Sequence, residues 1–377
     1  MSKKLKIVFW IGIVVIIVVV AFFILQKPDT KTAGTEPHKI GVVMSLTGNA
    51  AEYGDSTLKG MQVALDEINI DAKKMDIILE DDNSTATGAV SAFHKIIAAN
   101  NVPVVVGFLV SGGAVASAPV ANESKVVMIS TLCGTDDLKD AGDYVFRIRE
   151  SGKAHSLAMA KFLKENLKKD SVALFYASAI NGVSYADNFK REFERLGGKV
   201  VFEDQYIEKS NDFRSSLSKL KGVNPEAVYI AGMAPDMGLI INQANELGIK
   251  TQWLASPGAE NSKILEITKG AAEGLIFTTP LFRSDSKNEQ VEKFVENYRK
   301  KYGEDPDFAS ANGYDVIKLV NDMINKYGYD ADKIKAGLYG VVNFDGMGGT
   351  FSFDQFGEVE KPVMFRTVKD GKFVEYR

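Results

Sequence analysis

Residues 102–130 read VPVVVGFLVSGGAVASAPVANESKVVMIS, and this stretch decides the fold class. Two apolar runs, VPVVVG at 102–107 and VVMIS at 126–130, flank a segment rich in glycine, alanine and serine. Strands that are apolar at every position are typical of parallel sheets buried on both faces. The stretch therefore predicts two parallel strands joined by a crossover, which is the repeating unit of an α/β fold.

The same alternation of short apolar runs and amphipathic stretches extends along the chain in both directions. It predicts further strands at 40–44, 75–79, 171–176, 226–232, 251–256 and 274–280. After Pro280 the pattern becomes helical, at about 287–302 and 308–327, and a last β region ends GTFSFDQFGEV. The 377 residues suit two domains. We therefore predict an α/β protein with two doubly wound parallel-sheet lobes.

Composition excludes several classes of protein. The net charge is −4 and no basic block is present, which argues against nucleic-acid binding. The single cysteine cannot form an internal disulfide, and the three histidines are isolated in sequence, so a metal site has no support. No nucleophile elbow, phosphate-binding loop or dinucleotide fingerprint is present. We expect neither an enzyme nor a bound cofactor.

The N-terminus carries the strongest local signal. Residues 7–25 form an uncharged apolar run of 19 residues, and the preceding residues 1–6 contain three lysines. A helix of that length is about 28 Å long, close to the thickness of a membrane core. We expect a single-span anchor with residues 1–6 in the cytoplasm, residues 26–37 as a linker, and the rest outside the cell membrane. A cleaved secretory signal is the main alternative, and a buried core helix is a weaker one.

In open parallel sheets, ligands bind beyond the carboxyl ends of the strands. Helix N-termini at this edge present free N–H groups and a partial positive charge, which suit a carboxylate. The loops expected to form a site are 45–55, 107–113, 130–136, 177–183, 232–236 and 255–260.

The order and spacing of several segments resemble the leucine/isoleucine/valine-binding family of bacterial periplasmic proteins, the type I solute-binding proteins of ABC transporters. Besides residues 102–130, the segments are IGVVMSLTGNAAEYGDSTLKGMQVALDEIN, LEDDNSTATGAVSAFHKII, NGVSYADNFKREFERLGGKVV, APDMGLIINQANELGIKTQWLAS, ANGYDVI and FSFDQFGEV. The resemblance implies two lobes joined by three chain crossings, with the ligand in a cleft between them. Lobe one would be 38–150 plus 282–338, and lobe two 151–281 plus 339–377.

The resemblance also implies a set of ligand-binding residues. Ser111, with Leu109 in the same loop, would meet a ligand carboxylate, although a serine there also suits a helix cap. The next loop would offer backbone groups and a threonine, so that Gly134 or Thr135 serves. Its other members are Leu132 and Cys133, the latter a small apolar wall residue rather than a nucleophile.

The side-chain pocket and the ammonium site depart from the family pattern. Tyr53 matches an aromatic of the family pocket, whereas Asn181 and Met233 replace aromatics. Where the family has a glutamate for the ligand ammonium group, this chain has Pro257. Glu260 or Asp236 would have to supply the carboxylate, and a surface or capping role is the alternative for each.

We therefore expect an extracytoplasmic solute-binding protein that delivers its ligand to the permease of an ABC transporter. The ligand would be a branched-chain or other amino acid, or a related small amide or carboxylic acid. The alternative is a ligand-sensing module of a membrane signalling receptor.

Overall fold

The computed structural model describes residues 36–70 and 74–376. The predicted anchor at 7–25, its lysine-rich flank and nearly all of the predicted linker lie outside these residues. Within them, no helix combines the length and the apolar character that a membrane crossing requires. From Lys39 onward the chain folds as one compact unit.

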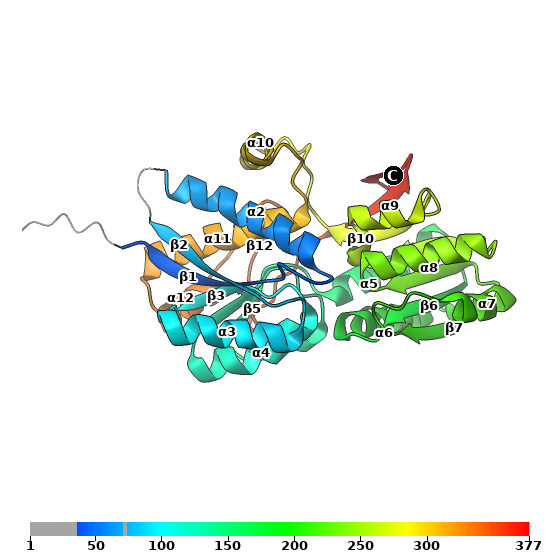
Figure 1. Ribbon diagram of the computed structural model, residues 1–377, viewed down its shortest axis with the longest axis horizontal. Helices are drawn as coiled ribbons and strands as arrows, with labels where there is room; N and C mark the ends of the chain where they lie inside the picture. The colour runs from blue at the N-terminus through cyan, green and yellow to red at the C-terminus, as the bar shows by residue number, and fades with distance from the viewer. Residues whose placement is uncertain (1–35, 71–73, 377) are drawn as a thin grey trace, which may run out of the picture. The chain divides into compact units, whose positions relative to one another are not determined.

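The first sheet has five strands in the order β2-β1-β3-β4-β5. Strands β1, β3, β4 and β5 pair in parallel. Helix α2 lies over one face of this sheet, and helices α3 and α4 cover the other (Figure 1). The bounds are β1 His38–Met44, α2 Ala51–Ile68, β2 Met75–Asp81, α3 Ala86–Asn100, β3 Val104–Gly107, α4 Ser111–Ser124, β4 Val127–Ser130, a 3₁₀ turn η1 Asp136–Leu138 and β5 Val145–Arg147.

The second sheet has seven strands in the order β14-β13-β10-β9-β8-β6-β7. Its bounds, with the intervening helices, are α5 Gly152–Lys161, a π-helical turn η2 Phe162–Asn166, β6 Ser171–Ala177, α6 Ile180–Arg195, β7 Lys199–Tyr206, α7 Arg214–Val223, β8 Ala227–Ala231, α8 Ala234–Glu246, β9 Gln252–Ala255, a 3₁₀ turn η3 Pro257–Ala259, α9 Ser262–Thr268, β10 Ile276–Pro280, β13 Val363–Lys369 and β14 Lys372–Glu375.

Alternate residues of the second sheet serve two separate cores. Val228 and Ile230 of β8 pack with α7, α8 and α9, whereas Tyr229 of the same strand packs with α5 and α6. Successive side chains of a strand point to opposite faces, so the helices cover both faces of the sheet. Apolar residues at every position of β8 follow from burial on both sides, as the sequence predicts.

The second sheet is mixed rather than parallel, which corrects the prediction of two parallel sheets. Strand β13 pairs antiparallel with β10, and β14 pairs antiparallel with β13. The connection between β13 and β14 is Asp370–Gly371, with φ of 52° and 67°. Two residues with positive φ form the tight turn whose twist matches a hairpin, and an Asp-Gly pair favours it. The chain can therefore return to the sheet edge without a crossover helix.

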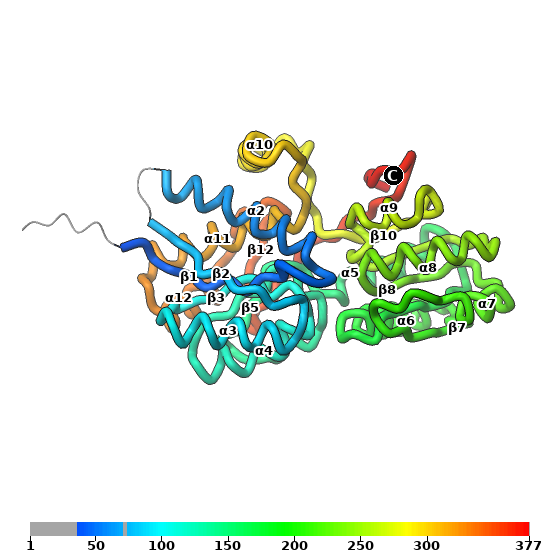
Figure 2. The backbone as a smooth tube through the Cα atoms, in the orientation of Figure 1, coloured from blue at the N-terminus to red at the C-terminus, as the bar shows by residue number. Residues whose placement is uncertain are grey.

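The chain leaves the second sheet after β10, passes through α10 and α11, and returns as β13 and β14 (Figure 2). The bounds in this segment are α10 Glu289–Tyr302, α11 Phe308–Tyr327, α12 Ala331–Tyr339, β11 Phe344–Gly346 and β12 Gly349–Phe351.

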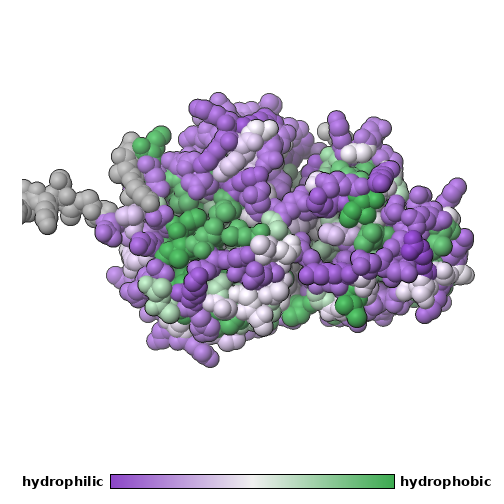
Figure 3. Space-filling view, viewed as in Figure 1, coloured by the Kyte–Doolittle hydropathy of each residue, from purple (hydrophilic) through white to green (hydrophobic). Residues whose placement is uncertain are grey.

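In Figure 3 hydrophilic side chains cover α10, while apolar surface lies over the edge strand β2, whose Ile77 and Leu79 are half-buried.

The β11–β12 hairpin and the residues that follow it belong to the core of the first sheet. Met347, Phe351, Phe353 and Val359 all pack in that core. The division drawn from the sequence assigns residues 339–377 to the second lobe, and the packing of 341–359 differs from it. The physical reason is that Asp315 of α11 accepts the Met347 N–H at 3.0 Å from both carboxylate oxygens, which fixes the hairpin against α11.

Asp315 should make stability depend on pH. Burial raises its pKa from 3.8 to about 6, although the nearby Lys361 charge opposes the change. A raised pKa means that the folded state holds the proton more firmly than the unfolded state, so stability falls as pH rises from about 4 to 6. The contribution is on the order of 3 kcal/mol. We expect Asp315→Asn to lose this dependence in urea unfolding at pH 4 and pH 7. A constant difference between variant and parent would contradict it.

Candidate ligand-binding site

A cavity of about 300 Å³ lies where the loops at the carboxyl ends of both sheets meet. Seven residues predicted from the sequence line it, and they come from four strand ends and from α2: Tyr53, Leu109, Ser111, Leu132, Gly134, Asn181 and Met233. Pro257 and Gly258 of η3 complete the wall from the second sheet. The strand-end rule therefore locates a single cavity that both sheets line.

Ser111 is the first residue of α4, and its hydroxyl does not cap that helix. The N-cap residue is Val110, and no side chain caps the helix start. Instead the Ser111 Oγ accepts the backbone N–H of Gly134 at 3.2 Å. The first N–H groups of a helix have no partner within the helix. Ser111 and Gly112 both line the cavity, so the start of α4 presents a hydroxyl and backbone donors to a ligand.

Two buried arginines fix the loop 131–135 through its carbonyl oxygens. Arg147 donates to the carbonyl oxygens of Cys133 at 3.1 Å and Thr135 at 2.7 Å, and it pairs with Glu358. Arg149 donates to the carbonyl of Leu132 at 3.0 Å. Three carbonyl oxygens of this loop are therefore bonded to guanidinium groups, and Leu132 and Gly134 of the loop line the cavity.

Cys133 and Thr135 do not line the cavity. The Cys133 side chain is fully buried, with its Sγ 3.6 Å from the Ser111 Oγ. The Thr135 Oγ1 accepts the N–H of Asp137 at 3.3 Å and so caps the short turn η1. Cys133 is thus a wall residue behind Ser111, and Thr135 is a structural cap.

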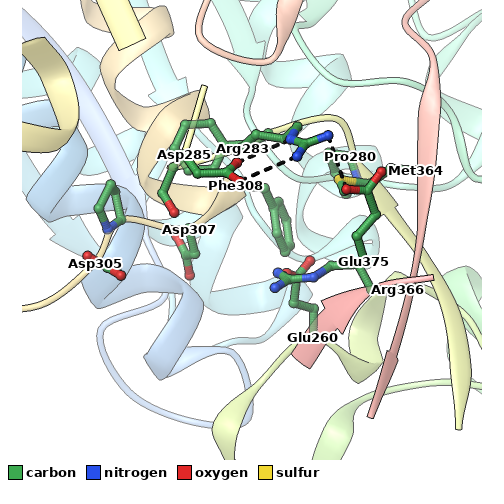
Figure 4. A pocket seen from close by; sticks show the side chains of 13 residues that line it. Glu260, Pro280, Arg283, Asp285, Asp305, Asp307, Phe308, Met364, Arg366 and Glu375 are labelled. Carbon is green, nitrogen blue, oxygen red and sulfur yellow. Dashed lines mark hydrogen bonds and ion pairs between the residues drawn. The ribbon is translucent and has the colours of Figure 1, made fainter. Parts of the chain in front are cut away.

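The two acids proposed to replace the family glutamate also lie outside the cavity. Asp236, in the first turn of α8, accepts the backbone N–H of Lys209 at 3.2 Å. Glu260 lines a second cavity of about 500 Å³ together with its ion-pair partner Arg366 (Figure 4). It also accepts a hydrogen bond from Thr279. Burial raises the pKa of Glu260, and the Arg366 charge opposes that rise. Each acid already has a partner elsewhere.

Tyr53 joins the two sides of the cavity. Its hydroxyl donates to the carbonyl oxygens of Gly258 at 3.1 Å and Glu260 at 3.3 Å. Next to it, the Ser262 hydroxyl donates to Glu52 at 2.8 Å. Helix α2 follows the first strand of one sheet, and η3 and α9 follow β9 of the other. These bonds therefore close one side of the cavity by direct contact between the two halves.

A family model for periplasmic binding proteins matches residues 37–372. The chain belongs to this family. Among curated relatives, it is 27% identical to the leucine-, isoleucine-, valine-, threonine- and alanine-binding protein of Pseudomonas aeruginosa, over 67% of this chain and 69% of that one. It is 28% identical to the Leu/Ile/Val-binding protein of Escherichia coli, over 65% of this chain and 68% of the relative.

Solved structures of the family have the same fold. A leucine binding protein from Thermotoga maritima superposes with a TM-score of 0.86 at 31% identity, over 90% of this chain and 98% of that one. A branched-chain amino acid substrate-binding protein from Streptococcus pneumoniae, in complex with isoleucine, gives 0.84 at 26% identity, over 90% and 98%. Family membership confirms the prediction of a binding protein rather than an enzyme.

Six cavity residues lie outside the loops expected from the sequence: Ser84, Ala86, Arg149, Tyr185, Glu208 and Phe308. Arg149 follows β5, a three-residue strand too short to stand out as an apolar run. Its side chain is 5% exposed, and its Nη2 donates to the Tyr185 hydroxyl at 3.4 Å. Glu208 follows β7, whose exposed positions break the apolar pattern. A charged residue just after a strand end is the feature of the sequence that could have identified both Arg149 and Glu208.

Proposed function

We propose that this chain is the extracytoplasmic solute-binding protein of an ABC transporter and delivers its ligand to a membrane permease. The ligand is an amino acid or a related small carboxylic acid held between two closing lobes. Relatives that bind leucine, isoleucine and valine support the ligand class. A cavity lined from both sheets, with Tyr53 bonded across it, supports closure around the ligand.

The start of α4 is the observation that carries the ligand class. A helix N-terminus favours negative charge, and a hydroxyl at the same point adds a hydrogen bond to an anion. Because neither Ser111 nor any other side chain caps α4, those donors remain for a carboxylate.

Ser111→Ala tests this proposal. We expect the full chain to show a raised melting temperature with one or more members of a panel of amino acids, short amides, and aliphatic and aromatic acids. For the best carboxylate, Ser111→Ala should weaken binding by about 1–3 kcal/mol in calorimetry, because a buried hydrogen-bond partner is lost. Ser117→Ala, a buried serine of the same helix outside the cavity, is the control. Unchanged affinity in Ser111→Ala would remove the serine from the site.

The packing suggests a revised division of the lobes. We place lobe one at 38–150 plus 282–359 and lobe two at 151–281 plus 360–377. The first core includes Val359, whereas β13, from Val363, belongs to the second sheet. The three crossings would then lie near residues 150, 281 and 360.

We also propose that residues 7–25 anchor the protein in the cell membrane, with the binding unit on the outer side. The uncharged run and the lysines before it support this orientation. Cleavage and secretion are the alternative. The intact mass of the protein recovered from membranes distinguishes them, because a loss of the first ~25–35 residues would rule out the anchor.

A further inference from the structure

Arg149 has hydrogen-bonding capacity that the protein does not use. A guanidinium group carries five N–H donors. Within the described residues, three oxygens accept from it: the carbonyls of Glu150 and Leu132 and the hydroxyl of Tyr185. The closest carboxylate oxygen, on Glu150, is 3.9 Å from Nη2, beyond hydrogen-bond distance.

His155 does not satisfy the remaining donors. Its Nε2 lies 3.1 Å from Nη2 of Arg149 and 2.7 Å from Oε1 of Glu150. Burial lowers the pKa of His155. The pKa of Glu150 is about 2, because the hydrogen bond from His155 and nearby charges outweigh the effect of burial, so Glu150 is the acceptor in this pair. A neutral ring nitrogen holds either a proton or a lone pair. The Nε2 nitrogen carries the proton that it donates to the Glu150 carboxylate, so it has no lone pair with which to accept an N–H of Arg149.

Glu208 is a carboxylate that lines the same cavity. Within the part of the chain that the structure describes, no hydrogen bond or ion pair joins its side chain, and burial raises its pKa. The adjacent Lys209 acts on it only through its charge. The bond from the Lys209 N–H to Asp236 fixes this loop to the start of α8. Glu208 is thus held at the cavity wall by the backbone rather than by a salt bridge.

The two charges lie beside helices that cover opposite faces of the second sheet. Arg149 contacts Tyr185 of α6, which packs with α5 on one face. Glu208 lies between β7 and α7 beside α8, and α7 and α8 cover the other face. In the same cavity, the position in η3 where the family pattern has its glutamate holds Pro257, which has no charge to offer an ammonium group.

We propose that the cavity selects a carboxylic acid whose ammonium group is several bonds away from the carboxylate. Arg149 and the start of α4 bind the carboxylate, and Glu208 binds the distal ammonium. In an α-amino acid both charges lie on neighbouring carbons, whereas Arg149 and Glu208 line the cavity from separate loops, after β5 and after β7, so we expect a longer chain to connect them. The inference rests on the proposed function and specifies the ligand class of that site.

Two isomers and one parent acid test the proposal: 5-aminopentanoate, norvaline and pentanoate. The first two have the same atoms and differ only in where the amino group is attached. In calorimetry on the full chain, 5-aminopentanoate should bind at least tenfold more tightly than norvaline. Glu208→Gln should weaken 5-aminopentanoate at least tenfold and leave pentanoate within twofold. Arg149→Met should weaken the binding of all three probes. A melting temperature measured on this variant checks that it still folds.

Asp212→Asn is the matched control, because Asp212 is an acid of the same β7–α7 loop that does not line the cavity. It should leave the preference between the isomers unchanged. Norvaline binding as tightly as 5-aminopentanoate, or an equal loss of all probes in Glu208→Gln, would overturn this inference and leave the proposed function intact. If no carboxylic acid binds, the proposed function falls as well.

Discussion

Replacing Gly60 with alanine is expected to lower the free energy of unfolding by about 3 kcal/mol, at the upper end of overpacking costs. Gly60 lies where α2 crosses α11. A Cβ atom there would be 1.8 Å from the carbonyl oxygen of Ser310. The contact is reciprocal, because a Cβ at Gly313 of α11 would be 2.1 Å from the carbonyl oxygen of Thr57. These obstacles are backbone atoms that cannot rotate away, so the helices would have to separate.

Gly222→Ala is the matched control for this experiment. Gly222 lies in the last turn of α7, and a Cβ there would meet nothing within 4 Å. Alanine is favoured over glycine in a helix by roughly 0.5–1 kcal/mol, so this variant should be unchanged or slightly more stable in urea unfolding. A similar loss in both variants would show that the contact between α2 and α11 is not the cause of the effect.

Replacing Arg366 with methionine is expected to destabilise the protein by about 3–5 kcal/mol above neutral pH. Arg366 of β13 pairs with the buried Glu260 and also donates to the carbonyl of Phe373 at 2.9 Å. Without the arginine, the Glu260 carboxylate would keep only the Thr279 hydroxyl as a side-chain partner. An unpaired buried charge costs more than the pair contributes.

The loss of stability in Arg366→Met should be smaller in acid, since a protonated Glu260 carries no charge to bury. The raised pKa of Glu260 gives the sign: protonation favours the folded state, so stability falls as pH rises through that pKa. The double variant Glu260→Gln with Arg366→Met should recover much of the stability. Arg299→Met, at the exposed pair with Asp305, should leave the melting temperature nearly unchanged. A pH-independent loss, or no recovery in the double variant, would refute the argument.

Part of the candidate site could be predicted because strand ends are readable from the sequence. Ser111, Leu132, Asn181 and Met233 each follow an apolar run, and the ends of parallel strands meet at one edge of a sheet. Glu260 failed as a prediction because its partner, Arg366, is 106 residues away in sequence and comes from an antiparallel strand. No local pattern indicates which arginine would reach it.

By itself the sequence determined the family, the two α/β halves and the loops that form the cavity, because apolar runs of strand length report burial directly. Only the tertiary structure decided which charges face the cavity. It assigned Glu260 to Arg366 and Asp236 to the Lys209 backbone, and it left Arg149 and Glu208 with unused capacity. The physical reason is that a charged side chain takes its role from whatever partner the fold brings within hydrogen-bond distance. Such partners are far apart in the sequence and meet only when the chain is folded. Glu260 and Arg366, for example, are 106 residues apart.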